Sequence, residues 1–319
     1  MPLNSVVEIR EADVRRLLPM PDAVRLVRES FAGLADGSAF NQPRRRLILP
    51  TGAILHQLAG SFEKYFGVKI YSTHPRNGAW FLVHLYDATT AQPLALVEAN
   101  WLGQIRTGAA SGVATDLLAK NDAATLAVIG SGFQARSQVE AVRITRTIRE
   151  VRVWSRDRSR REAFAREMNA IATPTAEEAV RGADIIVTAT YAKDPVIESS
   201  WVSPGAHINA MGSNNATRRE LPADLIERAG LIAVDSREQA RLESGDLALA
   251  WSETDWDTPR LCELQEVVAG TRSRTSDDDV TIFKSNGLGV QDIAVASWVY
   301  EEMMREKAET GSEQAIPAR

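Results

Sequence analysis

Thr125-Leu126-Ala127-Val128-Ile129-Gly130-Ser131-Gly132-Phe133-Gln134-Ala135 is an apolar run followed at once by a G-x-G-x-x-A turn. The run has the length of a buried parallel strand, and residues 136–146 carry a helical pattern. In a dinucleotide-binding unit the first glycine permits the tight turn, and the second lets the backbone approach the pyrophosphate. The third small residue lets helix pack on strand, and the helix N-terminus faces the phosphates.

This stretch therefore predicts a dinucleotide site, whereas a plain strand-to-helix turn is the alternative that needs no ligand. The cofactor-binding residues predicted from it are Gly130, Gly132, Phe133, Gln134 and Ala135. Because the stretch begins more than a third of the way along the chain, the residues before it are expected to form a domain of their own.

The bulk composition is that of a globular protein with two domains. The chain has 319 residues, of which 44% are hydrophobic and 25% charged, and its formal net charge is -5. A nucleic-acid binder normally carries a basic face, so this mild acidity argues against that class. Cys262 is the single cysteine, so we expect no disulfide and no metal site, and we expect Cys262 to be a small buried apolar residue.

The sequence gives no sign of a targeting or membrane segment. Residues 1–10 lack the basic segment and apolar core of a signal peptide. No run approaches the ~20 apolar residues that a membrane span needs. We therefore expect a cytoplasmic protein without a membrane partner.

Residues 1–120 are predicted to form a domain built on a mostly antiparallel sheet. Apolar residues at helical spacing predict a helix over 21–37. Strand patterns follow at 54–58, 67–72, 80–86 and 93–98, with a turn at 87–90.

Two basic features of this domain are candidates for chemistry. Arg44-Arg45-Arg46 is either a solvated surface run or an anion site for a substrate carboxylate. Strand alternation puts Lys69 on the same face as Tyr71. A lysine inside a strand is usually an edge or solvent-face residue, so the strand pattern alone favours that reading over catalysis.

The segment 102–114 is predicted to be a helix, and it is unusually rich in small residues. Small side chains allow another backbone or a ligand to approach closely. We expect Arg106 and Thr107 at the helix start, where free backbone N–H groups can meet an anion, and Thr107 is therefore a candidate cofactor contact. A tightly packed helix between domains is the alternative, and both readings can hold together.

Residues 121–292 are predicted to form an α/β domain with a doubly wound parallel sheet. Its strands alternate with helical stretches, and they are predicted at 125–129, 151–155, 184–189, 207–211, 231–235 and 280–283. A long helix follows to about Lys307, and the tail from Glu309 to Arg319 is expected to fray.

The end of the second of these strands bears on the cofactor. An acidic residue there would hold the ribose hydroxyls of NAD, but this strand ends in Ser155-Arg156. A hydroxyl and a guanidinium can bind a 2′-phosphate that an acid would repel, so the pattern favours NADP, with NAD as the alternative. In that alternative Asp157 takes the ribose, and the arginines nearby form a solvated helix face.

Two loops that follow parallel strands carry glycines, at residues 211–221 and 284–292. Ligands sit at such loops in doubly wound sheets. Gly212, Ser213, Ser285 and Gly287 are therefore predicted to lie near the nicotinamide end of the cofactor. As ordinary turns these loops would need no ligand.

In order and spacing, these motifs resemble the ornithine cyclodeaminase and mu-crystallin family. The segments that carry the resemblance are Gln104 to Ala110, Gly130 to Ala135, Gly212 to Leu221, Val234 to Ser236 and Phe283 to Gly287. The resemblance implies a homodimer with a Rossmann domain and an N-terminal dimerisation and substrate domain, which residues 293–319 complete with the C-terminal helix. Known members include ornithine cyclodeaminases, alanine dehydrogenases, ketimine and pyrroline-carboxylate reductases, and thyroid-hormone-binding crystallins.

By the same resemblance, Arg45, Lys69 and Arg106 fall on positions that hold the substrate carboxylate and its amino or imino group. Cyclodeaminases carry an aspartate where this chain has Asn214, and a glutamate where it has His56. A carboxylate can act as a general base, whereas an amide cannot. Asn214 is expected to orient substrate or cofactor, and His56 is either a proton donor or a structural hydrogen-bonding residue.

We therefore predict an NAD(P)H-dependent oxidoreductase acting on the C–N bond of a small amino or imino acid or a cyclic imine. Arg45 and Arg106 would clamp the carboxylate, and Lys69 would polarise the oxo or imino group or relay the proton. Two alternatives stay open. One is an ornithine cyclodeaminase-like ammonia lyase, and the other is a mu-crystallin-like protein that binds NADPH and a small ligand with little turnover.

Overall fold

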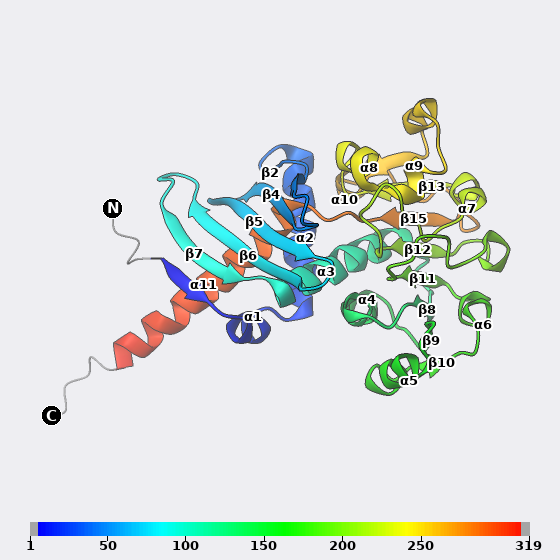
Figure 1. Cartoon of the computed structure of the whole chain (residues 1–319), viewed down its shortest axis with the longest axis horizontal. Helices are drawn as coiled ribbons and strands as arrows, with labels where there is room; N and C mark the ends of the chain where they lie inside the picture. Colours follow the sequence, from blue (N-terminus) through cyan, green and yellow to red (C-terminus); the bar gives the residue numbers. More distant parts are fainter. Residues whose placement is uncertain (1–5, 314–319) are drawn as a thin grey trace. The chain divides into compact units, whose positions relative to one another are not determined.

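The structure, a computed structural model, describes residues 6–313 (Figure 1). The chain folds into two compact units. Unit 1 contains the residues up to Arg106 and those from Leu288 onward, and unit 2 contains Thr107–Gly287. The division by function at 120–121 and 292–293 remains a prediction. Among residues 6–313, no helix is long and apolar enough to cross a membrane.

Unit 1 is a mostly antiparallel sheet packed against helices, as predicted. Its strand order is β1-β7-β6-β5-β4-β2, with β3 also paired to β4, and β1 runs parallel to β7. Its elements are β1 (Val7–Ile9), α1 (Glu11–Leu17), α2 (Met20–Asp36), β2 (Phe40–Asn41), β3 (Arg45–Ile48), β4 (Ile54–Phe62), β5 (Tyr65–His74), β6 (Gly78–Asp87), β7 (Pro93–Glu98) and α11 (Gly289–Glu313). The four predicted strands are confirmed as β4 to β7.

Two parts of unit 1 differ from the prediction. The strands β1, β2 and β3 were not predicted, because each is too short to show a clear alternating pattern. The final helix α11 continues to Glu313, so residues 309–313 are helical, and 314–319 lie outside the described residues.

The helix α11 lies along one face of this sheet, which we call the inner face (Figure 1). Glycines let the two backbones meet there. A Cβ on Gly60 would lie 2.5 Å from the backbone N of Val290, and one on Gly289 would lie 2.6 Å from the carbonyl oxygen of Ala59. Any larger side chain would push the helix away, so the first turn of α11 rests directly on the backbone of β4.

Unit 2 is a parallel sheet of eight strands in the order β10-β9-β8-β11-β12-β15-β13-β14. Its strands are β8 (Thr125–Ile129), β9 (Glu150–Trp154), β10 (Ile171–Ala172), β11 (Ile185–Thr188), β12 (His207–Ala210), β13 (Leu231–Val234), β14 (Leu261–Glu263) and β15 (Thr281–Lys284). Its α-helices are α4 (Phe133–Thr145), α5 (Arg158–Glu167), α6 (Ala176–Val180), α7 (Ala223–Arg228), α8 (Arg237–Glu243), α9 (Gly245–Ala248) and α10 (Leu264–Val268), and short 3-10 turns lie at Ser199–Trp201 and Glu253–Asp257.

All six predicted strands of this sheet are confirmed, and helices cover both of its faces (Figure 1). Within β8, Leu126 and Val128 pack into the core under α4 and α5, while Ala127 and Ile129 pack into the core on the α6 side. The last strand, β15, is inserted between β12 and β13, an order that the sequence did not reveal. Strand order reverses next to β8, which is where doubly wound sheets bind ligands.

The small-residue helix α3 (Asn100–Leu118) corrects one prediction. It begins at Asn100, directly after β7, so Arg106 and Thr107 lie well inside it and not at its start. Their backbone N–H groups belong to the helical ladder, and any anion must therefore be met by side chains. The small residues serve packing here, since a Cβ on Gly108 would lie 2.4 Å from the carbonyl oxygen of Ser137 in α4.

Candidate active site

The glycine loop after β8 has the geometry that a dinucleotide needs. Gly130 adopts a φ of 117°, and a Cβ there would lie 2.4 Å from the carbonyl oxygen of Ala189, so this position accepts only glycine. Gly132 precedes the first turn of α4, and a Cβ added to it would meet nothing within 4 Å. Ala135 is fully buried where α4 packs on the sheet. The open space at Gly132 therefore lies at a helix N-terminus, where phosphates bind.

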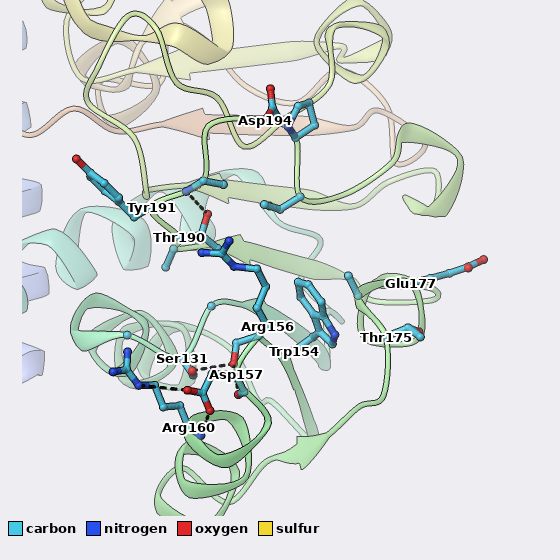
Figure 2. A pocket seen from close by; sticks show the side chains of 18 of the residues that line it. Ser131, Trp154, Arg156, Asp157, Arg160, Thr175, Glu177, Thr190, Tyr191 and Asp194 are labelled. Atoms are coloured by element: carbon cyan, nitrogen blue, oxygen red, sulfur yellow. Dashed lines mark hydrogen bonds and ion pairs between the residues drawn. The ribbon is translucent and has the colours of Figure 1, made fainter.

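A pocket of about 890 Å³ opens beside this loop, a size suited to a cofactor. Its walls come from the ends of neighbouring strands, and they include Gly130, Gly132, Trp154, Arg156, Thr190 and Tyr191. Figure 2 shows the Arg156 side chain extending from the end of β9 toward the loop that carries Thr190. The residues present thus fit a bound dinucleotide.

The end of β9 offers a hydroxyl and an exposed guanidinium to this pocket. Ser155 Oγ accepts a hydrogen bond of 2.9 Å from Ser131 Oγ in the glycine loop. The Asp157 carboxylate caps α5, since it accepts hydrogen bonds from the backbone N of Arg160 at 3.0 Å and from Ser159 Oγ at 2.8 Å. These bonds lower the pKa of Asp157, and both go to its Oδ1, so the carboxylate caps α5 through one oxygen.

The two loops predicted near the nicotinamide are held by a buried network of charged side chains in unit 2. Lys284 pairs with Asp246 at 3.0 Å, with both side chains fully buried, and it donates to the carbonyl oxygen of Ser213. The Glu220 carboxylate accepts from the backbone N of Gly212 at 2.7 Å and from that of Thr190 at 2.6 Å. Burial is the main cause that raises the pKa of Glu220, and its hydrogen bonds work against that rise.

The same network extends to the second of these loops. The backbone N of Gly287 donates to Asp235 at 2.7 Å, and Gly287 adopts a φ of 80°. Ser285 is buried beside it. Gly212, Ser213, Ser285 and Gly287 are therefore rigidly placed at the carboxyl ends of the strands, while their contacts with a cofactor remain a prediction.

A separate cluster of charged side chains lies on the inner face of unit 1. Lys69 Nζ donates to Asp292 Oδ1 at 3.0 Å, and Arg106 Nε donates to the same oxygen at 2.9 Å. Arg106 also donates to the side chain of Gln291 at 3.3 Å. Lys69 is only 3% exposed and Asp292 is fully buried, so the solvent-facing position that is usual for a strand lysine is excluded.

The surroundings of Lys69 change its protonation. Burial lowers the pKa of Lys69 to about 8, helped by the positive charges of Arg106 and Arg44, while Asp292 raises it. Lys69 Nζ lies 5.8 Å from the ring centre of Tyr71 and 5.6 Å from that of Phe81. A Cβ on Gly103 would come within 3.0 Å of Nζ, so this glycine of α3 leaves room for the ammonium. Lys69 can thus gain or lose a proton near neutral pH.

Arg45 and Arg46 lie on β3, which pairs with β4 and its His56, and Arg44 directly precedes β3. Arg44 is buried, and its charge influences both Lys69 and His56, whereas Arg45 is exposed on β3. His56 stacks on Tyr71 with ring centres 4.1 Å apart, and its Nε2 lies 3.0 Å from Thr73 Oγ1. Burial lowers the pKa of His56 to about 4, so the imidazole is neutral at pH 7.

The structure therefore gathers Lys69, Arg106 and His56 in unit 1, and it places Asn214 in unit 2 as an exposed loop residue. The sequence did not single out Asp292 or Gln291, and the family resemblance pointed to Arg45, whereas the buried arginine of the triplet is Arg44. The signal for Asp292 was an acid among mostly apolar residues at the start of a helix. Cys262 is buried as expected, and burial raises its pKa to about 12. Within residues 6–313, no group of three or more His, Cys, Asp or Glu side chains could hold a metal.

The chain is similar to known proteins over most of its length. A sequence model described as the ornithine cyclodeaminase/mu-crystallin family matches residues 5–307. A Delta(1)-pyrroline-2-carboxylate reductase from Bacillus cereus is 39% identical over 266 residues, which cover 79% of this chain and 81% of the relative.

Two solved structures are similar over nearly the whole chain. The Thermococcus litoralis Delta(1)-pyrroline-2-carboxylate reductase in complex with NADH and L-proline has a TM-score of 0.88 and 30% identity, covering 95% of this chain and 98% of that one. An archaeal alanine dehydrogenase dimer with bound NAD has a TM-score of 0.89 and 32% identity, covering 95% and 97% of the two chains.

We predict that Gly132→Ala weakens NAD(P)H binding without destabilising the fold. The added methyl group meets no protein atom within 4 Å, but it occupies the space through which a pyrophosphate would approach the backbone. We expect the Kd measured by fluorescence titration to rise roughly tenfold or more, with stability changed by less than about 0.5 kcal/mol. Gly130→Ala is the contrasting variant, because it should lower the unfolding temperature as well. Unchanged binding by Gly132→Ala would show that the pyrophosphate does not bind at this loop.

Proposed function

The chain belongs to the ornithine cyclodeaminase/mu-crystallin family, and from this premise we propose that it reduces the C=N bond of a small 2-imino acid, such as the cyclic imine pyrroline-2-carboxylate. The protein is an NAD(P)-dependent oxidoreductase acting on C=N or CH–NH groups. The observation that carries the choice of substrate is the buried cluster of Lys69, Arg106 and Asp292.

The charges of this cluster suit an imino acid. Lys69 and Arg106 bring two positive charges to a buried region in which Asp292 supplies one negative charge. A substrate carboxylate would offset the excess, and the planar guanidinium groups suit that shape. Lys69, with its pKa near 8, would give a proton to the substrate nitrogen, which becomes an amine on reduction. The bound nicotinamide would supply the hydride.

The remaining candidates have supporting roles in this proposal. A neutral His56, stacked on Tyr71, can orient substrate by hydrogen bonding more readily than it can deliver a proton at pH 7. Asn214 offers an amide where a general base would be needed for cyclodeamination. Both observations favour imine reduction over ammonia loss from ornithine.

We predict that imine reduction follows the protonated form of Lys69. With pyrroline-2-carboxylate and NAD(P)H, kcat/KM should be level below about pH 8 and fall roughly tenfold per pH unit above it, because the proton donor is lost. In the reverse direction the rate should rise through the same pH, since amine oxidation needs the neutral lysine. Lys69→Met should lower kcat/KM by roughly 100-fold or more and abolish this pH dependence. The measurement is nicotinamide absorbance across a pH series.

Three results would contradict the proposal, the first from this assay and the others from ammonia and binding measurements. Failure of every cyclic imine, and of oxo acids with amines, to oxidise NADH or NADPH would remove the reductase function. Release of ammonia from ornithine without net cofactor change would identify a lyase. Tight binding of NADPH and a small ligand without turnover would identify a binding protein.

Arg44 is the stronger candidate for the carboxylate than Arg45, because Arg44 is buried near Lys69 and Arg45 is exposed. We predict that Arg44→Met raises KM for the imino acid roughly tenfold, whereas Arg45→Met changes it less than about twofold. Steady-state kinetics of the two variants decides the assignment. The opposite ranking would restore the clamp role that the family resemblance gives to Arg45.

The cofactor is a nicotinamide dinucleotide, and we propose NADP as the preferred form. Ser155 and the exposed Arg156 would bind the 2′-phosphate, while Asp157 caps α5 through its Oδ1. The neighbours solved with NADH and with NAD support the alternative.

We predict that Arg156→Ala lowers kcat/KM for NADPH by roughly tenfold and leaves that for NADH within about twofold, because one charge-assisted hydrogen bond is lost. Arg158→Ala is the matched control, since the Arg158 side chain is exposed and pairs with Glu162 at 2.7 Å. Equal losses with both cofactors, or a wild type that prefers NADH, would contradict the choice of NADP.

We also propose that unit 1 forms a homodimer through the face of its sheet opposite α11. Exposed apolar side chains gather on the strands there, including Leu47, Phe66 and Trp80, and a monomer rarely exposes a patch of this kind. The archaeal neighbour is a dimer. Light scattering tests the homodimer, because a monomeric mass would exclude it.

The cytoplasm stays the predicted location of the protein, which cell fractionation would test.

A further inference from the structure

One carboxylate oxygen holds both cations of the proposed reaction centre. Asp292 Oδ1 accepts from Lys69 Nζ at 3.0 Å and from Arg106 Nε at 2.9 Å, while Asp292 Oδ2 has no hydrogen-bond partner among residues 6–313. We propose that Asp292 is the positioning residue of the reaction: it fixes the spacing of Lys69 and Arg106 and keeps Lys69 protonated until the substrate takes the proton. The role of Asp292 in turnover rests on the proposed reductase function.

The position of Asp292 is itself fixed by backbone contacts. It lies in the first turn of α11, where Gly289 and Gly60 bring the helix against β4 with no side chain between them. Gln291, the preceding residue, holds a second nitrogen of Arg106 at 3.3 Å. The helix therefore fixes the position of the Asp292 carboxylate. The carboxylate in turn positions the two cations that it binds.

The shared oxygen sets a distance that suits the chemistry. Two donors bound to one oxygen at 3.0 and 2.9 Å lie no more than about 6 Å apart. In a 2-imino acid the carboxylate and the nitrogen are attached to the same carbon. Arg106 can then bind the carboxylate while Lys69 lies beside the nitrogen. An imine whose C=N group is remote from its carboxylate would not satisfy both residues.

The charges around Lys69 explain why an acid is needed. The groups that act on Lys69 are Arg106 from α3, Arg44 before β3, and Asp292 from α11, and the Tyr71 ring lies 5.8 Å from its Nζ. Burial and both arginines disfavour the ammonium form, and among these groups Asp292 alone favours it. Without its negative charge, Lys69 would lose its proton at a lower pH and would no longer act as a donor near neutrality.

Asp292→Asn separates charge from shape. The amide oxygen can still accept hydrogen bonds from both cations, so the geometry is largely kept while the charge is removed. The direct readout is the titration of the Lys69 side chain, followed by NMR of protein labelled with ¹³C-lysine and assigned with Lys69→Arg. We expect the titration midpoint of Lys69 to fall by about one pH unit or more. An unchanged midpoint would overturn the proposal.

Turnover supplies an independent readout. The alkaline limb of kcat/KM should move down by the same amount, so Asp292→Asn should lose activity at pH 8 and regain most of it near pH 6. A loss that is equal at every pH would indicate a merely structural role and overturn the proposal. Glu301→Gln is the control on the same helix, because Glu301 contacts Tyr65 at 2.7 Å and not Lys69.

Two further outcomes keep the test decisive. If Asp292→Asn does not fold, Asp292→Glu retains the charge but displaces it, so kcat should fall while the Lys69 midpoint stays near that of the wild type. Full activity of Asp292→Glu would contradict the positioning role. If the wild type reduces no imine, the proposed function fails, but the NMR midpoints still decide whether Asp292 governs the protonation of Lys69.

Discussion

The direct contact between the backbone of β4 and the first turn of α11 is the constraint on which the reaction centre depends. Gly60 and Gly289 allow it, and a Cβ on either would overlap main-chain atoms of the other element. Helix and strand meet with no side chain between them, so the helix has one position relative to the sheet. Asp292 then lies within hydrogen-bond reach of Lys69, a residue 223 positions earlier in the sequence.

Buried charge is tolerated here because of how it is arranged. Removing an ammonium from water is costly unless an opposite charge and hydrogen bonds replace the solvent. Asp292 supplies both to Lys69 and Arg106. The balance stays positive because two cations share one carboxylate, and this excess suits a substrate anion. This arrangement gives Lys69 a pKa of about 8, so that both of its protonation states are accessible near neutral pH, as is common for catalytic groups.

Unit 2 uses buried charge for a different purpose. Lys284, Asp246 and Glu220 are completely buried, and they bind backbone groups of the loops that follow the strands. These loops have no regular structure of their own, so side chains must satisfy their backbone polar groups. These hydrogen bonds hold the loops in place, and in the glycine loop after β8 the turn requires the positive φ of Gly130.

Local sequence determined the elements whose signal is local. An apolar run followed by two glycines specified β8, its turn and α4, and periodicity found the longer strands, because both depend on neighbouring residues. Alternation placed Lys69 and Tyr71 on one face, but it could not say that this face is the buried one. That was decided by α11, which packs on it from the other end of the chain. The burial of Arg44, the pairing of Asp292 with two cations and the insertion of β15 between β12 and β13 were likewise decided by tertiary contacts, since each joins residues that no short-range pattern connects.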